Sequence, residues 1–429
     1  MLADDDRAGP NCAAGGHALD SMDSLAATPS VLRDPVAGQL ELFLRFPRLA
    51  EVLPWVVLGA YPTPVSRLHL PAAAPGHGNP RGVELWAKRE DLTSPHYGGN
   101  KVRTIEGHFG RALARGRRRI WATGAYGSNH ALATAVHAAR AGLDSGAILV
   151  PQPATATAHA NLRALAATTC MISTAGHWLL RPAAAVRLLS DPAEVVMTPG
   201  GAIPLGALGH VSAALELAAQ VARGELPAPA HVVVTAGSTA TAAGLLVGLH
   251  LAAALEIGWR RPPQLVAVPV APNPFASAPM IALLARATLR LLRNSLGADS
   301  GVADRIDASA LRRGLRVDSH HNGAGYGHPS PSGEAARRLF QEATELAAQR
   351  PDLERPPLLD LVYTARSAAG MLALLPDAQG PVLHWMTKSA APLAEASDTA
   401  IEKLPRPLRR WLAQPPVEAP LDAPPFDNG

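Results

Sequence analysis

The sequence predicts an α/β protein of two lobes, each built on a twisted, mostly parallel sheet with helices covering its faces. With 429 residues, the chain is long enough for two domains with substantial cores. Short runs rich in Val and Ile alternate with longer helix-like runs, which is typical of parallel sheets with covered faces. This alternation occurs in two blocks, over 120–173 and 232–270, and therefore predicts two lobes.

Local patterns predict the individual elements of each block. In the first block we expect strands at 120–123, 147–150 and 170–173, and helices over 130–141 and 161–167. In the second we expect strands at 232–235 and 265–270, a helix over 242–255 and an apolar helical stretch over 274–293. A further helix is expected from Lys101, because apolar residues at 102, 105, 109 and 113 fall on one face.

Composition marks the two ends of the chain, and the two blocks of alternating strands and helices suggest the domains between them. Residues 1–40 mix small, acidic and Pro residues without periodicity and are expected to form a flexible extension, within which Met22 is an alternative start. We expect a large domain from 41–105 and 216–404, and a small α/β domain from 106–215 between them. A Pro-rich tail is expected over 405–429, with a short amphipathic piece at 408–412.

Charge and cysteine content limit the function classes. The formal net charge of +4 and the 17% of charged residues indicate a globular protein without a dedicated nucleic-acid surface. The sequence has no uninterrupted apolar stretch long enough to span a bilayer, so no membrane partner is expected. Cys12 and Cys170 are too far apart in sequence for a disulfide framework or a metal motif, so we expect no metal and a reducing, cytoplasmic location.

The first motif with chemical content is the run over 88–103. Gly98 and Gly99 allow a tight turn just before the helix that begins at Lys101. The positive end of a helix disfavours a cation, and a neutral amine is what a Schiff base requires. The alternative is a solvated lysine near a helix start.

Two further motifs join a strand to a helix, where free backbone amides bind anions. In the run over 123–130, Ser128 and the amides after it suit a carboxylate, although a capped helix is the simpler alternative. In the run over 236–244, five residues suit a phosphate: Gly237, Ser238, Thr239, Ala240 and Thr241. This second run lacks the lysine of a nucleotide P-loop, which argues against a P-loop site. No Gly-x-Gly-x-x-Gly follows a strand, which argues against a nucleotide-binding dehydrogenase.

The run over 88–103 resembles the signature of the D-cysteine desulfhydrase and 1-aminocyclopropane-1-carboxylate (ACC) deaminase family, and the resemblance extends over about 58–393. The family is pyridoxal-phosphate (PLP) dependent and tryptophan synthase β-like. The resemblance therefore implies a two-lobed fold-type-II enzyme with PLP on Lys101. It also implies that Ser128, Asn129 and His130 form a substrate loop, with Asn129 at the phenolic oxygen of PLP, and that 237–241 form the phosphate cup.

The run over 360–370 resembles the family segment that carries an active-site tyrosine, here Tyr363, followed by a residue at the pyridine nitrogen, here Thr364. Tyr326 resembles a second active-site tyrosine. The resemblance implies the catalytic set Lys101, Ser128, Tyr326 and Tyr363. At the positions of Tyr363 and Thr364, D-cysteine desulfhydrases have a pattern similar to Tyr-Thr, whereas ACC deaminases have one similar to Tyr-Glu. A threonine supports a neutral pyridine ring, which suits β-elimination.

Three departures from the family pattern bear on the substrate. Thr239-Ala240 stands where the cup usually has Gly-Gly, and Arg366 replaces a lysine. The usual His-Thr-Gly-Gly run corresponds to residues 386–389, which places Lys388 where it either brings a charge to the site or points outward.

We therefore expect a PLP-dependent enzyme that removes a β substituent from a small amino acid. The first reading is a D-cysteine desulfhydrase-like reaction that gives a keto acid, ammonia and sulfide. The alternatives are ACC deaminase-like deamination and a PLP-binding protein with little catalysis. A homodimer is the default expectation for a symmetric enzyme.

Overall fold

The computed structural model describes residues 40–71, 82–177, 185–186, 188 and 191–417. The predicted extension over 1–40 lies outside this part of the chain except for Leu40, and so does the end of the predicted tail after 417.

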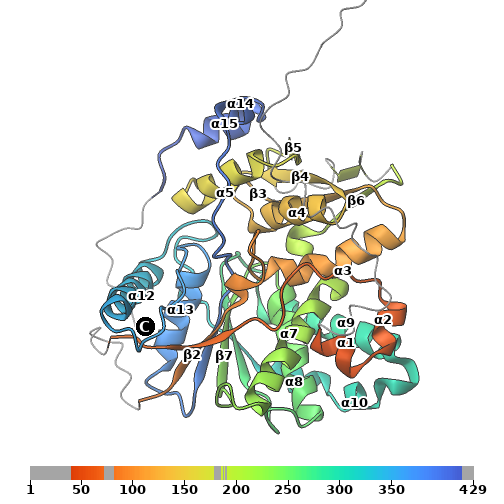
Figure 1. Ribbon diagram of the computed structural model, residues 1–429, viewed down its shortest axis with the longest axis vertical. Coiled ribbons are helices and arrows are strands. Elements are labelled where there is room, and N and C mark those ends of the chain that lie inside the picture. Colours follow the sequence, from red (N-terminus) through yellow and green to blue (C-terminus); the bar gives the residue numbers. More distant parts are fainter. Residues whose placement is uncertain (1–39, 72–81, 178–184, 187, 189–190, 418–429) are drawn as a thin grey trace, which may run out of the picture.

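A six-stranded sheet organises the larger half of the molecule (Figure 1). Its order is β1 (Val65–Leu68), β2 (Leu85–Lys88), β10 (Val382–Trp385), β7 (His231–Ala236), β8 (Gln264–Pro269) and β9 (Leu315–Val317). Only the pair β1 and β2 is antiparallel, and every other neighbouring pair is parallel. Strands from both ends of the described chain thus meet in one sheet.

Helices cover both faces of this sheet (Figure 1). On one face Val232 and Val234 of β7 pack in a cluster with helices α1 (Glu41–Arg45), α2 (Arg48–Val52), α7 (Pro204–Ala222), α8 (Ala240–Ala254) and α9 (Ala278–Leu296). On the other face Val233 packs with α12 (Pro331–Gln349) and α13 (Thr364–Leu374). Successive side chains of a strand point to opposite faces, so a strand covered on both sides reads as a continuous apolar run.

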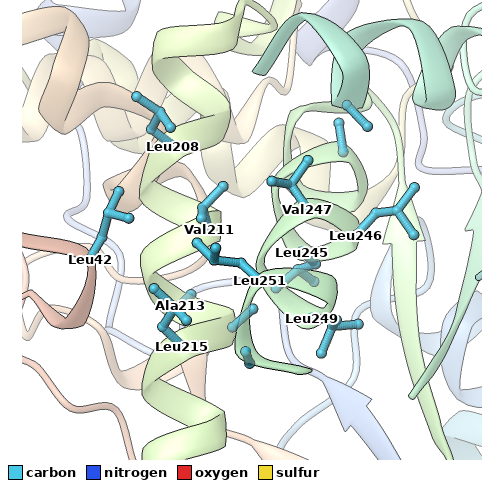
Figure 2. Packing of buried hydrophobic residues seen from close by; sticks show 14 of the residues in the cluster. Leu42, Leu208, Val211, Ala213, Leu215, Leu245, Leu246, Val247, Leu249 and Leu251 are labelled. Atoms are coloured by element: carbon cyan, nitrogen blue, oxygen red, sulfur yellow. The ribbon is translucent and has the colours of Figure 1, made fainter. Parts of the chain in front are cut away.

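The pair α7 and α8 forms the centre of the larger core. Figure 2 shows Val211 of α7 on the side of that helix next to α8, whereas Leu208 and Leu215 lie on the side of Leu42. A helix that is apolar all round is one that is buried all round. By length and composition α7 also qualifies as a membrane-spanning helix, but 89% of the relevant window is buried inside the protein.

A four-stranded parallel sheet organises the smaller half. Its order is β5 (Met171–Thr174), β4 (Asp144–Val150), β3 (Arg119–Ala125) and β6 (Glu194–Val196). Its core includes residues of α3 (Lys101–Ala114), α4 (Asn129–Arg140) and α5 (Ala156–Ala166). The two sheets confirm the predicted fold class, while the exact domain boundaries stay a prediction.

The end of the described chain returns to the smaller sheet, where α14 (Asp398–Glu402) and α15 (Arg406–Leu412) lie beside α5 (Figure 1). Leu408 and Trp411 are buried there, and the Trp411 indole donates to the Gln152 carbonyl at 2.7 Å. The predicted tail from 405 therefore begins with a docked helix, because the amphipathic piece at 408–412 has an apolar face to bury.

The remaining elements are short. They are η1 (Glu90–Leu92), η3 (Pro199–Gly201), η4 (Gly297–Ser300), α10 (Gly301–Asp304) and α11 (Ala308–Arg313).

Buried charges fix α3, the helix that carries Lys101. The Arg103 guanidinium donates to both oxygens of Glu90 at 2.7 Å and to Glu216 on α7 at 2.9 Å. The Lys88 ammonium contacts Glu216 at 2.5 Å, and all four side chains are at most 4% exposed. Two cations and two carboxylates compensate one another, as buried charges require. The charged residues of the 88–103 signature thus position Lys101 without themselves lining its amine.

Candidate active site

Lys101 is the first residue of α3, and its side chain is partly buried. Its ammonium nitrogen, Nζ, donates to the Ser238 hydroxyl at 3.0 Å and to the Gly200 carbonyl at 3.3 Å. Burial lowers the pKa of Lys101 from 10.5 to about 8. No carboxylate is bonded to the amine within the described residues, so a neutral form suited to attack on an aldehyde is accessible near neutral pH.

The two glycines before Lys101 are required by close backbone contacts. Gly99 has φ +87°, and a Cβ there would lie 2.6 Å from the Thr387 carbonyl oxygen. The backbone N–H of Gly98 donates to the Ser389 hydroxyl at 2.8 Å, and that of Asn100 to the Thr387 carbonyl at 3.2 Å. The segment after β10 is therefore packed directly against the turn that carries Lys101.

The predicted phosphate cup lies between β7 and α8. Ala240, Thr241 and Ala242 begin α8 and are buried, and the backbone N–H groups of a helix's first turn have no partner within the helix. Thr241 accepts from the Asn100 amide at 2.8 Å, which links the cup to the Lys101 turn. The cup therefore presents helix-end N–H groups and the Ser238 hydroxyl beside Lys101, a donor set that fits a phosphate.

Thr239 has a left-handed backbone, with φ 69° and ψ −21°. This conformation is natural for glycine and strained for a β-branched residue. The Thr239 hydroxyl donates to the Ser238 carbonyl at 2.6 Å. Thr239 thus adopts a backbone conformation that glycine takes more readily, at the cost of local strain.

Asn129 lies at the start of α4, and its side-chain oxygen accepts three hydrogen bonds. The donors are the Tyr97 hydroxyl at 2.9 Å, the Asn161 amide at 2.7 Å and the Lys388 ammonium at 3.0 Å. The sequence assigned Asn129 but gave no signal for Asn161, and it left the direction of Lys388 open. In the structure Lys388 points into this cluster.

Ser128 and His130 flank Asn129 in the predicted substrate loop. The Ser128 hydroxyl accepts from the Ala131 N–H at 3.2 Å, so it is Ser128 that caps α4, and its own proton remains available to an acceptor. His130 is 3% exposed, and neither of its ring nitrogens has a partner among the described residues. Burial, with the nearby Lys101 and His108, holds the pKa of His130 well below 6.5. An orphaned neutral imidazole close to Lys101 fits a site that receives a polar ligand.

The two predicted tyrosines lie together, with their hydroxyl oxygens 2.8 Å apart and their rings edge to face. Arg366 on α13 is buried and donates to the Gly325 carbonyl at 2.8 Å and to the His328 carbonyl. Arg366 therefore holds the loop that carries Tyr326 against the start of α13. Burial, with the neighbouring Tyr326, raises the pKa of Tyr363 well above 10, so its phenol stays protonated.

Thr364, predicted to face a pyridine nitrogen, is the first residue of α13. Its hydroxyl donates to Asp360 Oδ1 at 2.8 Å and accepts from the Asp360 N–H at 2.8 Å. Asp360 also accepts from the backbone N–H groups that open α13. The Thr364 hydroxyl is therefore engaged in closing a turn, and its proton is not directed at a cofactor in this arrangement.

Comparison with known proteins agrees with this geometry. A family described as "Pyridoxal-phosphate dependent enzyme" matches residues 56–326. Nocardicin C-9' epimerase of Nocardia uniformis subsp. tsuyamanensis is 34% identical over 316 residues, which cover 72% of this chain and 87% of that protein. D-cysteine desulfhydrase of Salmonella choleraesuis (strain SC-B67) is 32% identical over 365 residues, which cover 81% of this chain and 96% of that protein.

This chain is a pyridoxal-phosphate-dependent enzyme of fold type II. A solved structure described as an ACC deaminase homologue shares the fold, with a TM-score of 0.57 and 24% identity over 82% of this chain and 95% of that one. The cofactor of the enzyme is PLP. The residues present fit it: Lys101 for the aldehyde, the N–H groups that open α8 for the phosphate, and Asn129 for the phenolic oxygen.

Proposed function

We propose that this PLP-dependent enzyme catalyses β-elimination from a small β-substituted amino acid, with D-cysteine as the first candidate substrate. When bound, PLP supplies an electron sink for negative charge at the substrate α-carbon. The substrate loses its α proton and its β substituent, and water converts the released enamine to a keto acid and ammonia. With D-cysteine the products are pyruvate, ammonia and sulfide.

The observation that carries this proposal is the hydroxyl pair of Tyr326 and Tyr363, which Arg366 holds in place. Lys101, with a pKa of about 8, takes up and releases a proton near neutral pH and so suits removal of the α proton. Tyr363 remains protonated and suits donation to a departing sulfur. The relative named D-cysteine desulfhydrase, aligned over 96% of its length, supports the same reaction.

The test is turnover by purified holoenzyme of D-cysteine, L-cysteine, β-chloro-D-alanine and ACC. The readouts are ammonia and the keto acid, which is 2-oxobutanoate from ACC and pyruvate from the others, together with sulfide from the cysteines. Replacing Tyr363 with Phe is expected to lower kcat by roughly 100-fold, the lower range for loss of a general acid, while the enzyme still loads PLP. Absence of pyruvate from both D-cysteine and β-chloro-D-alanine contradicts the proposal. A higher turnover of ACC transfers the assignment to deamination.

A second candidate is epimerisation at the α-carbon. It is favoured by the relative named nocardicin C-9' epimerase and by a second amine, Lys388, close to Asn129. Epimerisation in D₂O places deuterium at the α-carbon and inverts its configuration without forming a keto acid. The homodimer and the cytoplasmic location stay predictions.

A further inference from the structure

Lys388 stands three residues after the end of β10, at a position that resembles one where the related family usually has glycine. Its ammonium donates to Asn161 Oδ1 at 2.8 Å, to Asn129 Oδ1 at 3.0 Å and to the Tyr97 hydroxyl at 3.2 Å. It also lies 5.3 Å from the centre of the Tyr97 ring. Three acceptors use all three N–H groups of an ammonium, so this lysine is a cation held in one direction.

We propose that Lys388 is a positioning residue for the cofactor: it fixes the side-chain amide of Asn129 so that the NH₂ group faces PLP, and it adds a positive charge on that side. The inference rests on PLP as the cofactor and on Asn129 as the partner of its phenolic oxygen. It does not depend on which substrate the enzyme uses.

The orientation follows from the chemistry of the donors. An ammonium has no acceptor, so the atom that each amide turns toward Lys388 must be its oxygen. With its oxygen bound there, Asn161 presents its NH₂ to the Gly127 carbonyl at 2.9 Å and to Asn129 Oδ1 at 2.7 Å. Both amides are therefore set by one lysine.

The consequence for Asn129 is that its NH₂ group is directed away from the cluster. Three donors already converge on its oxygen. The hydrogen bonds of the described residues include no protein acceptor for Asn129 Nδ2. A phenolic oxygen of the cofactor is an acceptor of the kind that this free NH₂ group requires.

The charge of Lys388 has a separate effect. Burial lowers the pKa of Lys388 to about 8, while the Asp360 carboxylate acts in the opposite direction, so the cationic form predominates at pH 7. The phenol of Tyr97 is buried with its pKa raised and is neutral at this pH. A fixed cation near the phenolic oxygen favours negative charge there and opposes protonation of the bound cofactor.

The test is a pH titration of the visible absorbance of the holoenzyme, together with the dissociation constant of PLP. Lys388→Met keeps most of the unbranched side chain, one atom shorter, and removes both the charge and the donors. We expect it to raise the pH midpoint of the absorbance change by about one unit and to weaken PLP binding about tenfold. Lys388→Gln keeps a donor for Asn129 without the charge, so the midpoint moves while the affinity stays within about threefold.

The matched control is Lys403→Met, which removes an exposed lysine near α14 and is expected to change neither quantity. In an Asn129→Ala background, Lys388→Met is expected to lose its effect on affinity, because the amide through which it acts is gone. If Lys388→Met titrates and binds PLP as Lys403→Met does, the proposal is overturned. If Lys388→Met fails to fold by circular dichroism, Lys388→Gln decides the charge effect alone, and an unchanged midpoint overturns it. Both readouts are independent of substrate turnover, which alone tests the proposed β-elimination.

Discussion

Lys101 in the cofactor-free protein is expected to capture PLP with a pH midpoint near 8, well below that of an ordinary lysine. Only the neutral amine attacks an aldehyde, and burial lowers the pKa of Lys101 from 10.5 to about 8. A pKa lower by about 2.5 units leaves about 300 times more neutral amine at pH 7. The second-order rate constant of capture at pH 7 should exceed that of a free lysine side chain by about this factor.

The assay is stopped-flow absorbance of the cofactor-free protein mixed with PLP between pH 6 and 10. Nα-acetyl-lysine, whose side-chain amine is free, serves as the reference amine. The ratio of the rate constant of the protein to that of the reference amine cancels the titration of PLP itself. His130, next to Lys101, stays neutral over this range because its pKa lies well below 6.5. The pKa of Lys388 is also lowered to about 8, so Lys388→Met is used to exclude this lysine as the source of the midpoint. The midpoint of PLP capture is expected to be the same in that variant.

Lys101→Arg controls for charge and is expected to abolish capture, because a guanidinium does not deprotonate in this range. A midpoint above 9.5 in the wild-type protein, or capture by Lys101→Arg, would refute the reasoning that burial prepares this amine.

Three further predictions concern the frame of the site. Glu216→Gln leaves Lys88 and Arg103 buried with one carboxylate too few, and should lower the free energy of unfolding by about 3–5 kcal/mol, measured by urea denaturation; a loss below 1 kcal/mol contradicts a tightly compensated network. Thr239→Gly relieves a left-handed strain of about 1–3 kcal/mol, but glycine raises the entropy of the unfolded chain, so the cofactor-free protein should be as stable or about 1 kcal/mol more stable. Thr239→Val keeps the strain and loses the hydrogen bond of the hydroxyl, so it should be less stable by about 1 kcal/mol. Trp411→Ala should release α15 from the smaller sheet and cost about 3–5 kcal/mol, and limited proteolysis after residue 404 should then become faster; unchanged proteolysis would mean that α15 is held by other contacts.

Local sequence patterns were sufficient for five of the ten described strands, namely β3, β4, β5, β7 and β8. The predicted strands at 120–123, 147–150 and 232–235 lie within β3, β4 and β7, and the helix expected over 242–255 corresponds to α8. These segments are continuous apolar runs between turn residues, so their burial can be read locally. The strands β1, β2, β6, β9 and β10 were not predicted, because three or four residues show no clear period and the place of each strand depends on pairing with distant segments.

The site was predictable where its chemistry is written in consecutive residues. Contiguous motifs predict Lys101 at a helix start, the loop that opens α8, and the two tyrosines Tyr326 and Tyr363, with the family resemblance supplying the roles. The family resemblance assigns Thr364 to a pyridine nitrogen, and this role stays a prediction; the structure adds that its hydroxyl, four residues after Asp360, closes a local turn.

The sequence alone determined the fold class, because it depends on short-range periodicity. The family resemblance of one contiguous motif indicated the cofactor and predicts Lys101 as the lysine that carries it. Tertiary structure alone decided that Glu216 on α7 neutralises charges beside α3, and that Lys388 faces Asn129 and Asn161. Whether a charged side chain contacts a partner or water depends on which segments, distant in sequence, fold beside it. No local sequence pattern encodes the position of those segments.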